Sequence, residues 1–235
     1  MLSAAETKFI SIGDKLAAAG CLLSLGDIQY MFGHYEAAQE IYSIAKTRFE
    51  SCRSQAGAVA CLQSLGDIQS MLSHYEVAQD MLSEAQTKYE GIGDQLGAAQ
   101  CLQSLGNIQL RLSHYDAAHE MLSAAKFKFE GIREQLGAAQ CLKGLGDIQC
   151  MLHRYDAAQE IISAAKTKFE SIGHQLGVAW CLKSLGFIFK VQNKFQDAFT
   201  YFTQAKERYS EIDHFTLDEQ TCRRELALLS EVRHL

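Results

Sequence analysis

Five cysteines recur at an interval of 40 residues, and the sequence around them recurs with the same interval. The five are Cys21, Cys61, Cys101, Cys141 and Cys181. The string CLQSLGDIQ, which begins at the second of them, returns with few changes at the others, and residues 55–94 and 95–134 agree at 24 of 40 aligned positions. A fixed period of this length indicates an array of one supersecondary unit, each copy packing on its neighbours.

The composition allows a folded array and disfavours several other classes. The chain has 235 residues, of which 48% are hydrophobic, and contains no proline. Because proline interrupts helices, its absence favours long uninterrupted ones. The formal net charge is -6, whereas a protein that follows phosphate backbones needs a basic stripe. Nucleic acid is therefore a poor partner.

Each unit carries two helical stripes separated by short turns. Apolar residues at steps of three and four form a first stripe, Leu62, Leu65, Ile68 and Leu72, and a second, Ala78, Leu82, Ala85 and Tyr89. The residues between the stripes, Ser73-His74-Tyr75, suffice only for a tight antiparallel reversal. In the second reversal, Gly91-Ile92-Gly93-Asp94, a glycine is available as a C-cap and Asp94 as the N-cap of the next helix.

This pattern predicts the organisation of the whole chain. We expect a partial unit with only its second helix at 1–14, five 40-residue units at 15–213 and a C-terminal capping helix at 214–235. The capping helix is more polar, as a helix whose outer face meets water requires. Residues 1–5 match residues 121–125 inside a second helix, so we expect further repeats or another domain upstream.

Cysteine and histidine spacing argues against a metal or a cofactor. Equivalent residues one unit apart lie on helix pairs about 20 Å apart, too far for disulfides or a shared ion. The recurrent cysteines are interpreted as small buried residues, and the turn histidines His34, His74 and His114 as exposed or capping residues. Free thiols indicate a reducing compartment. No signal peptide or membrane span is apparent, so we expect a cytoplasmic protein without membrane contact.

The residues that recur at the same positions of every 40-residue unit resemble the tetratricopeptide repeat (TPR). The family pattern has a Leu-Gly pair in helix A, an aromatic residue at the turn and two alanines in helix B, here Leu65, Gly66, Tyr75, Ala78 and Ala85. All five units carry this set. The resemblance implies an all-α fold, a right-handed α-solenoid of antiparallel helix pairs. In it, Gly66 and its equivalents would let helices A and B approach closely.

The chain departs from the usual TPR pattern in three ways. The period is 40 rather than 34, the closing proline is absent and Leu62 replaces the usual tryptophan. The six extra residues lengthen either the helices or the connection. Longer repeats of this kind resemble those of cell-polarity adaptors that bind spindle proteins, and the arrays of NACHT and NB-ARC signalling NTPases. The phosphate-binding loop of such NTPases has no counterpart in this chain.

The resemblance implies that A helices line a concave groove. The columns expected to face it vary between units while core positions barely change, which fits either neutral drift or selection by a partner. The predicted partner-contacting residues are Gln63, Asp67, Gln103, Asn107, Arg111, Lys143, Asp147, Trp180, Lys183, Phe187, Lys190 and Arg224.

The C-terminal end of this set suggests one kind of partner. Its cations and the lone tryptophan, a residue type that often dominates interfaces, favour an acidic peptide with an apolar anchor near Trp180 and Lys183. The alternative is that Trp180 packs under the closing helix.

Two function hypotheses follow from the repeats. The first is a scaffold that binds a protein or peptide in the A-helix groove. The second is a self-associating array, through the uncapped N-terminal half-unit, or the sensor segment of a larger signalling NTPase. Catalysis needs unlike residues converging on one point. The array instead spreads like residues along a surface, so we expect no enzyme.

Overall fold

The computed structural model describes residues 9, 13–212 and 216–233, and the described residues form eleven α-helices and no strand. The chain divides into two compact units, unit 1 at Met1–Leu112 and unit 2 at Ser113–Leu235. Each is described by itself. The predicted all-α architecture is present in both.

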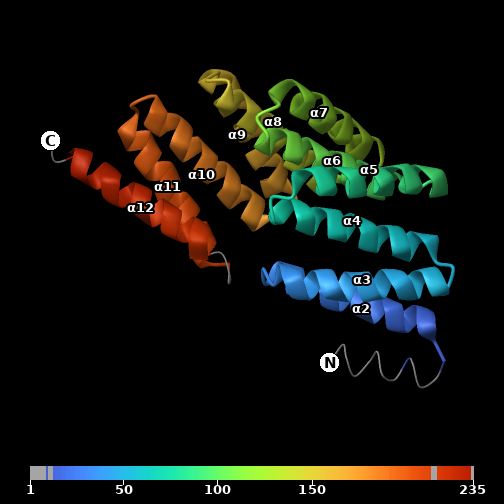
Figure 1. Cartoon of the computed structure of the whole chain (residues 1–235). Coiled ribbons are helices and arrows are strands. Elements are labelled where there is room, and N and C mark those ends of the chain that lie inside the picture. Colours follow the sequence, from blue (N-terminus) through green and yellow to red (C-terminus); the bar gives the residue numbers. More distant parts are fainter. Residues whose placement is uncertain (1–8, 10–12, 213–215, 234–235) are drawn as a thin grey trace. The chain divides into compact units, whose positions relative to one another are not determined.

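Unit 1 contains three A helices and two B helices. In chain order they are α2 (Lys15–Met31), α3 (Tyr35–Ser51), α4 (Gln55–Met71), α5 (Tyr75–Ile92) and α6 (Gln95–Arg111). Successive helices lie side by side in antiparallel pairs (Figure 1). The A helices α2, α4 and α6 also contact one another, so their outward residues form one continuous surface.

Unit 2 repeats this arrangement and ends with a single helix. Its helices are α7 (Tyr115–Gly131), α8 (Gln135–Met151), α9 (Tyr155–Ser171), α10 (Gln175–Val191), α11 (Phe195–Ser210) and α12 (Thr216–Arg233). Helix α12 packs on α11, at the end of the unit (Figure 1). It contributes Cys222 and Leu229 to the core of unit 2.

The six extra residues of the period lie in the helices. Nearly all helices are 17 residues long, and the connections from α2 to α11 have two or three residues, as at 32–34 and 52–54. Of the two possibilities left open by the sequence, the lengthened helix is therefore the one found.

Each described turn within a unit contains one residue in the left-handed region. At the A–B turn after α4, Ser73 has φ 64°, and the His74 N–H donates to the Gln69 carbonyl at 2.8 Å. At the B–A turn after α5, Gly93 has φ 77° and the Asp94 side chain accepts from the Gly97 N–H at 2.9 Å. The glycine C-cap and the Asp94 N-cap predicted for this second turn are confirmed.

Glycines at two positions of the A helices permit close helix packing. Helix α2 is the exception at the second position, where it carries Ala17. A Cβ on Gly66 would lie 2.9 Å from Leu82 Cγ in the B helix of the same repeat, as the sequence predicts. A Cβ on Gly97 would lie 2.5 Å from the Tyr89 ring in the B helix before it. Gly137 and Gly177 meet aromatic rings in the same way. Each of these A helices is therefore fitted between two B helices, and the second glycine column was not identified from the sequence.

The recurrent cysteines pack as small apolar residues in the cores. Cys61, Cys101, Cys141 and Cys181 are buried, Cys21 is half-buried, and all are free thiols. Burial raises the pKa of Cys61 and Cys101 to about 12, so these thiols stay protonated. The expected half-unit at 1–14 lies almost entirely outside the described residues, and the predicted repeat boundaries stay predictions.

Candidate partner-binding surface

The outward faces of the A helices, here called the A walls, carry the predicted partner-contacting residues. In unit 1 the A wall includes Gln63 and Asp67 on α4 and Gln103, Asn107 and Arg111 on α6. Asn107 and Arg111 are exposed and the other three are half-buried. All five are accessible at least in part, as partner-contacting residues must be.

In unit 2 the cations of the A wall are paired with carboxylates. Lys143 Nζ lies 2.6 Å from Asp147 Oδ2, one turn along α8. Lys183 Nζ lies 2.5 Å from Asp218 Oδ1 of α12, and Lys190 forms an ion pair with Glu225 of the same helix. These ion pairs neutralise the lysine charges that were expected to attract an acidic partner. Arg224 is exposed on α12.

The two aromatic candidates of unit 2 both rest on its core. Trp180 is half-buried against the core cluster, with its ring 6.1 Å from that of His174. His174 is itself fixed, because its Nδ1 accepts the Gly177 N–H at 2.9 Å at the start of α10. Phe187 is 36% exposed and meets Phe202 edge-on at 5.0 Å. Trp180 thus supports the core, and Phe187 keeps an accessible face.

Asp67 is the carboxylate of unit 1 with the most perturbed environment. Burial raises its pKa to about 6, while a hydrogen bond from the Ser104 hydroxyl on α6 acts in the opposite direction. Burial also raises the pKa of Tyr30 on α2 to about 12, with the charge of Asp67 as the second cause. Three neighbouring A helices therefore bring Tyr30, Asp67 and Ser104 together on one wall.

The residue one turn before the carboxylate distinguishes the two walls. In unit 2 that residue is Lys143, which pairs with Asp147. In unit 1 the residue one turn before Asp67 is Gln63, which has no charge to offer. The nearest cation of the wall, Arg111, directs its Nη2 to Met71 Sδ at 3.9 Å. Among the described residues, no ion pair forms on Asp67.

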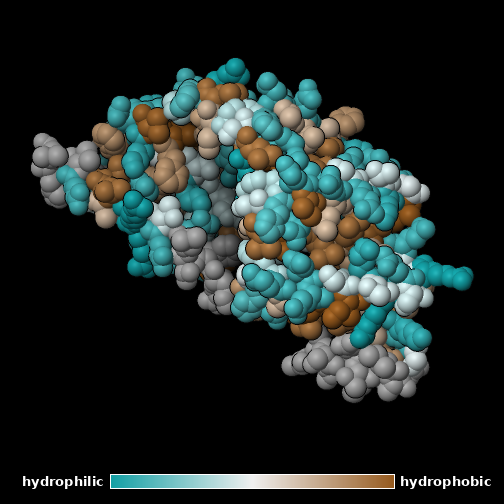
Figure 2. Space-filling view, viewed as in Figure 1, coloured by the Kyte–Doolittle hydropathy of each residue, from teal (hydrophilic) through white to brown (hydrophobic). Residues whose placement is uncertain are grey.

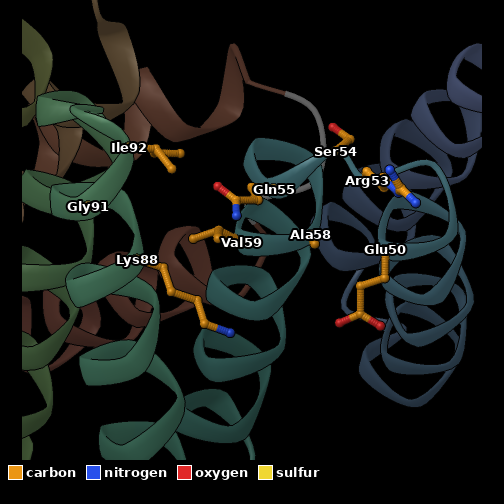
Figure 3. A pocket seen from close by; sticks show the side chains of 9 residues that line it. All are labelled: Glu50, Arg53, Ser54, Gln55, Ala58, Val59, Lys88, Gly91 and Ile92. Carbon is orange, nitrogen blue, oxygen red and sulfur yellow. The ribbon is translucent and has the colours of Figure 1, made fainter.

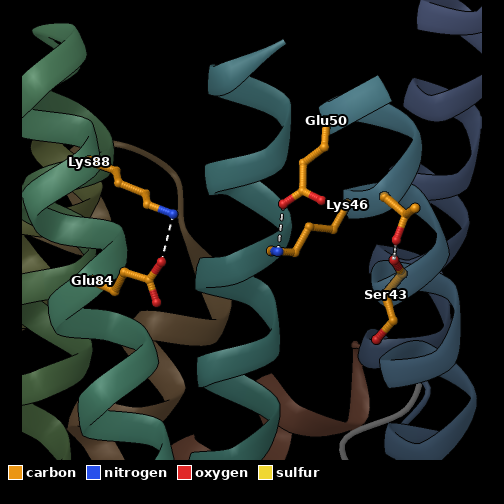
Figure 4. Close-up of polar contacts among 6 residues, drawn as sticks. Ser43, Lys46, Glu50, Glu84 and Lys88 are labelled. Atoms are coloured by element: carbon orange, nitrogen blue, oxygen red, sulfur yellow. Dashed lines mark hydrogen bonds and ion pairs between the residues drawn. The ribbon is translucent and has the colours of Figure 1, made fainter. Parts of the chain in front are cut away.

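A concave feature of unit 1 lies at the B–A connections. A cavity of about 840 Å³ is lined by the ends of α3 and α5 and the start of α4, with Arg53, Val59 and Lys88 among its residues (Figure 3). Two of its charged side chains pair along their own helices. Lys88 Nζ lies 2.6 Å from Glu84, and Glu50 lies 2.7 Å from Lys46 (Figure 4).

The turn histidines serve the connections. His34 Nδ1 donates to Gln29 Oε1 at 2.8 Å, and His74 Nδ1 donates to Gln69 Oε1 at 2.9 Å. Each bond joins the turn to a side chain of the A helix before it. Of the two roles expected, the exposed one is found, because both histidines are exposed and neither side chain caps the helix that follows. Within the part of the chain that the structure describes, no three His, Cys, Asp or Glu side chains gather as a metal ion requires.

The described surface is mixed in character. On the face shown in Figure 2, hydrophilic and hydrophobic residues are interspersed. Within the described residues, every helix is too short or too polar to span a bilayer.

Sequence reasoning missed two groups of wall residues. The first is the pair Asp218 and Glu225, which bind Lys183 and Lys190. The signal was present, because the two acids are seven residues apart on α12, as the two lysines are on α10. The second is Met71 with Tyr30, which flank Asp67 and whose roles follow only from the packing of neighbouring A helices.

The sequence and the fold both match known repeat proteins. Residues 135–211 match the family model of the tetratricopeptide repeat. Residues 135–211 therefore carry tetratricopeptide repeats, and the same helix pair recurs in both units. A comparison with curated proteins gave no match in sequence.

Three solved structures illustrate the fold match. The Rap conjugation gene regulator of the plasmid pLS20, solved with a Phr peptide, superposes with a TM-score of 0.77 at 16% identity, covering 93% of this chain and 65% of that one. A Rap protein complexed with Competence and Sporulation Factor gives 0.72 at 17% identity, covering 98% and 68%.

The third is a signal transduction ATPase with a tetratricopeptide repeat sensor from Pyrococcus horikoshii, which gives a TM-score of 0.68 at 14% identity. The match covers 94% of this chain and 34% of that chain. At these identities the matches establish the fold, and they confirm the expected α-solenoid class.

Proposed function

We propose that the chain is a scaffold that binds a protein or an extended peptide along its A walls. The observation that carries this proposal is the contrast between constant and variable positions. Gly66 and Cys61 recur in every 40-residue repeat. The wall position of Gln63 instead varies, and the other repeats carry Leu23, Gln103, Lys143 and Lys183 there. A constant framework with a variable outward face suits recognition of unlike side chains along a partner.

The fold matches support the same proposal. Two of the matched Rap proteins were solved with a bound peptide or factor. The long helices of this chain lengthen each wall, because every added residue extends a helix by about 1.5 Å.

A display library of random peptides selected against the purified chain tests this function. We expect the selected peptides to lose at least tenfold in affinity on Gln63→Arg, in the wall of unit 1, or on Phe187→Ala, in the wall of unit 2. Thr87→Arg, on the exposed face of the B helix α5, is the matched control and should change affinity less than twofold. Equal losses from wall and control variants would contradict wall binding.

A second candidate is a sensor segment within a signalling NTPase. The fold match to the archaeal ATPase, whose own repeats are named a sensor, favours it. If the parent gene encodes an NTPase domain, peptides that bind the A walls should change the ATP hydrolysis rate of the full-length protein. An unchanged rate at saturating peptide would remove this candidate.

A further inference from the structure

The acidic charge of the molecule is concentrated in unit 1. Unit 1 has seven Lys and Arg against twelve Asp and Glu, a formal net charge of -5. Unit 2 has fifteen against sixteen, a net charge of -1. The two units share one framework, so the difference lies in the side chains that the framework displays. A field of this sign attracts cations to unit 1.

Two aspartates stand at equivalent positions of the A wall of unit 1. Asp27 of α2 is exposed and accepts a hydrogen bond from the Tyr42 hydroxyl at 2.7 Å. Asp67 of α4 has no ion pair among the described residues. Its side chain is half-buried between neighbouring A helices, where a charge is costly unless a counter-charge or hydrogen bonds accompany it. The Ser104 hydroxyl supplies one hydrogen bond. Gln63 one turn earlier is neutral, and the guanidinium of Arg111 is directed to Met71 rather than to the carboxylate.

Apolar side chains lie one turn beyond the aspartates of α4 and α2. Met71 lies one turn beyond Asp67 on α4 and is 38% exposed. Met31 is at the equivalent position of α2 and is 74% exposed. Flexible, polarisable methionine side chains adapt to varied apolar partners. The wall thus presents an anionic position beside an adaptable apolar one.

We propose that the A wall of unit 1 binds a partner segment through a cationic group placed on Asp67, with a neighbouring apolar side chain of the segment against Met31 and Met71. The cation is an arginine or lysine side chain or a free α-amino group. The inference rests on the function proposed above and specifies the chemistry of its partner. It is opposite in sign to the acidic partner expected from Lys183 and Lys190, whose charges α12 neutralises.

The binding should depend on pH through Asp67. The groups that face this carboxylate are Tyr30 from α2, Tyr89 from α5, and Cys101 and Ser104 from α6. Burial and the charge of Asp67 raise the pKa of both tyrosines and of the cysteine, so these three stay protonated over the range considered. Arg111 of α6 lies close enough to affect Tyr30. Of the set, Asp67 changes charge between pH 4.5 and 7.5, so a cationic segment should bind more tightly at pH 7.5.

Carboxyl-carbon NMR on the intact chain tests the cation site directly. The probes are N-acetyl-arginine-N-methylamide for a side chain, glycinamide for a free α-amino group and N-acetyl-glutamine-N-methylamide as the neutral control. A bound cation should lower the pKa of Asp67 by about half a unit or more, since it favours the ionised form. A shift with one cationic probe alone assigns the source. No shift with either, or an equal shift with the glutamine probe, overturns the proposal.

Peptides selected as described above give an independent test. They should be enriched in arginine or lysine, and Asp67→Asn should weaken their binding about tenfold at pH 7.5. Asp80→Asn, the same charge change at an exposed position of α5, should alter binding less than twofold. Circular dichroism verifies that both variants keep their helices.

The two proposals fail in distinguishable ways. Peptides that bind through the A walls, lack cationic residues and are indifferent to Asp67→Asn would overturn the inference and leave the scaffold function standing. Peptides whose binding ignores every wall variant would overturn the scaffold function itself.

Discussion

Unit 1 and unit 2 are built on the same helix pair and differ in how their A walls are charged. In unit 2 three lysines of the wall have carboxylate partners, at Asp147, Asp218 and Glu225. In unit 1 the equivalent column offers glutamine, and Asp67 has a hydroxyl but no cation. The repeat framework can therefore stay constant while the residue one turn before the aspartate position varies. That residue determines whether the charges of the wall are paired within it or remain available to a partner.

The end of the array adds to this contrast. Helix α12 lies where the next A helix of unit 2 would follow, and its acids bind Lys183 and Lys190. The same helix buries Cys222 and Leu229. Capping unit 2 thus covers its core and also neutralises its wall, which leaves the wall of unit 1 as the more strongly charged of the two.

The largest effect should come from the framework and should be equal in both units. In unit 1, Gly97→Ala places a methyl group 2.5 Å from the Tyr89 ring, and Gly177→Ala in unit 2 places one 2.3 Å from the Phe169 ring. Each should lower the free energy of unfolding by about 2–3 kcal/mol through overpacking. Urea denaturation measures the free energy of unfolding of each variant.

Gly91→Ala is the control for this pair of variants. Its Cβ meets nothing within 4 Å, so the change should stabilise α5 by up to ~1 kcal/mol through helix propensity. Unequal losses at Gly97 and Gly177 would break the idea of a common framework.

The ion pairs of α12 should matter more than surface pairs of unit 1. Lys190→Met leaves Glu225, whose side chain is 12% exposed, without its cation, and should cost about 1–2 kcal/mol. Lys46→Met breaks a pair on the exposed face of α3 and should cost less than about 0.5 kcal/mol. A double variant with Glu225→Gln should recover part of the first loss. Similar losses of stability from Lys190→Met and Lys46→Met would contradict a stabilising role for the ion pairs of α12.

Asp67→Asn should stabilise the chain in a pH-dependent way. The pKa of Asp67 in the folded state, about 6, is above the ordinary aspartate value of 3.8, so the folded state holds the proton more tightly than the unfolded state. The stability that this group contributes is full below pH 3.8 and is lost as the pH rises through 6. Removing the charge should therefore add about 1–2 kcal/mol at pH 8, discounted for partial exposure, and nothing near pH 4.

Denaturation at the two pH values, with Asp80→Asn as control, measures this difference. The control should change stability by less than about 0.5 kcal/mol at either pH, because Asp80 is exposed on α5. A stabilisation by Asp67→Asn that is the same at pH 4 and pH 8 would contradict the perturbed carboxylate.

The smallest effects should come from the B–A turns, one in each unit. Arg53 and Arg133 have φ values of 57° and 59°, in the region that glycine occupies at Gly93 and Gly173. Replacing either arginine by glycine should stabilise by about 0.5 kcal/mol, because relief of strain outweighs the added chain entropy. Thermal unfolding of the single variants measures it, and a loss of stability in either would count against strained turns.

Much of the local structure was predictable from residue spacing. The two stripes of each repeat and the Asp94 cap follow from period, glycine placement and helix capping. The first turn, expected at 73–75, is found one residue earlier, at 72–74. The approach at Gly66 followed from a family resemblance. The burial of Cys61 and Cys101 followed from the distance between copies. These features depend on neighbours close in sequence or on one repeat distance.

What remained unpredicted depends on which faces meet between repeats. The second glycine column at Gly97 makes sense only once α6 is known to pack on the ring of Tyr89. The pairing of Lys190 with Glu225 depends on where α12 docks. The roles of Lys183 and Trp180 changed for the same reason, since one is paired and the other supports the core.

The amino-acid sequence by itself determined the repeat, its two helices, its turns and the glycine that joins them, because these rest on local spacing and backbone chemistry. The tertiary structure alone decided which wall charges are already paired and which carboxylate is left without a cation. Lys183 and Lys190 each pair with a carboxylate 35 residues further along the chain, and such approaches are set by packing rather than by order along the chain.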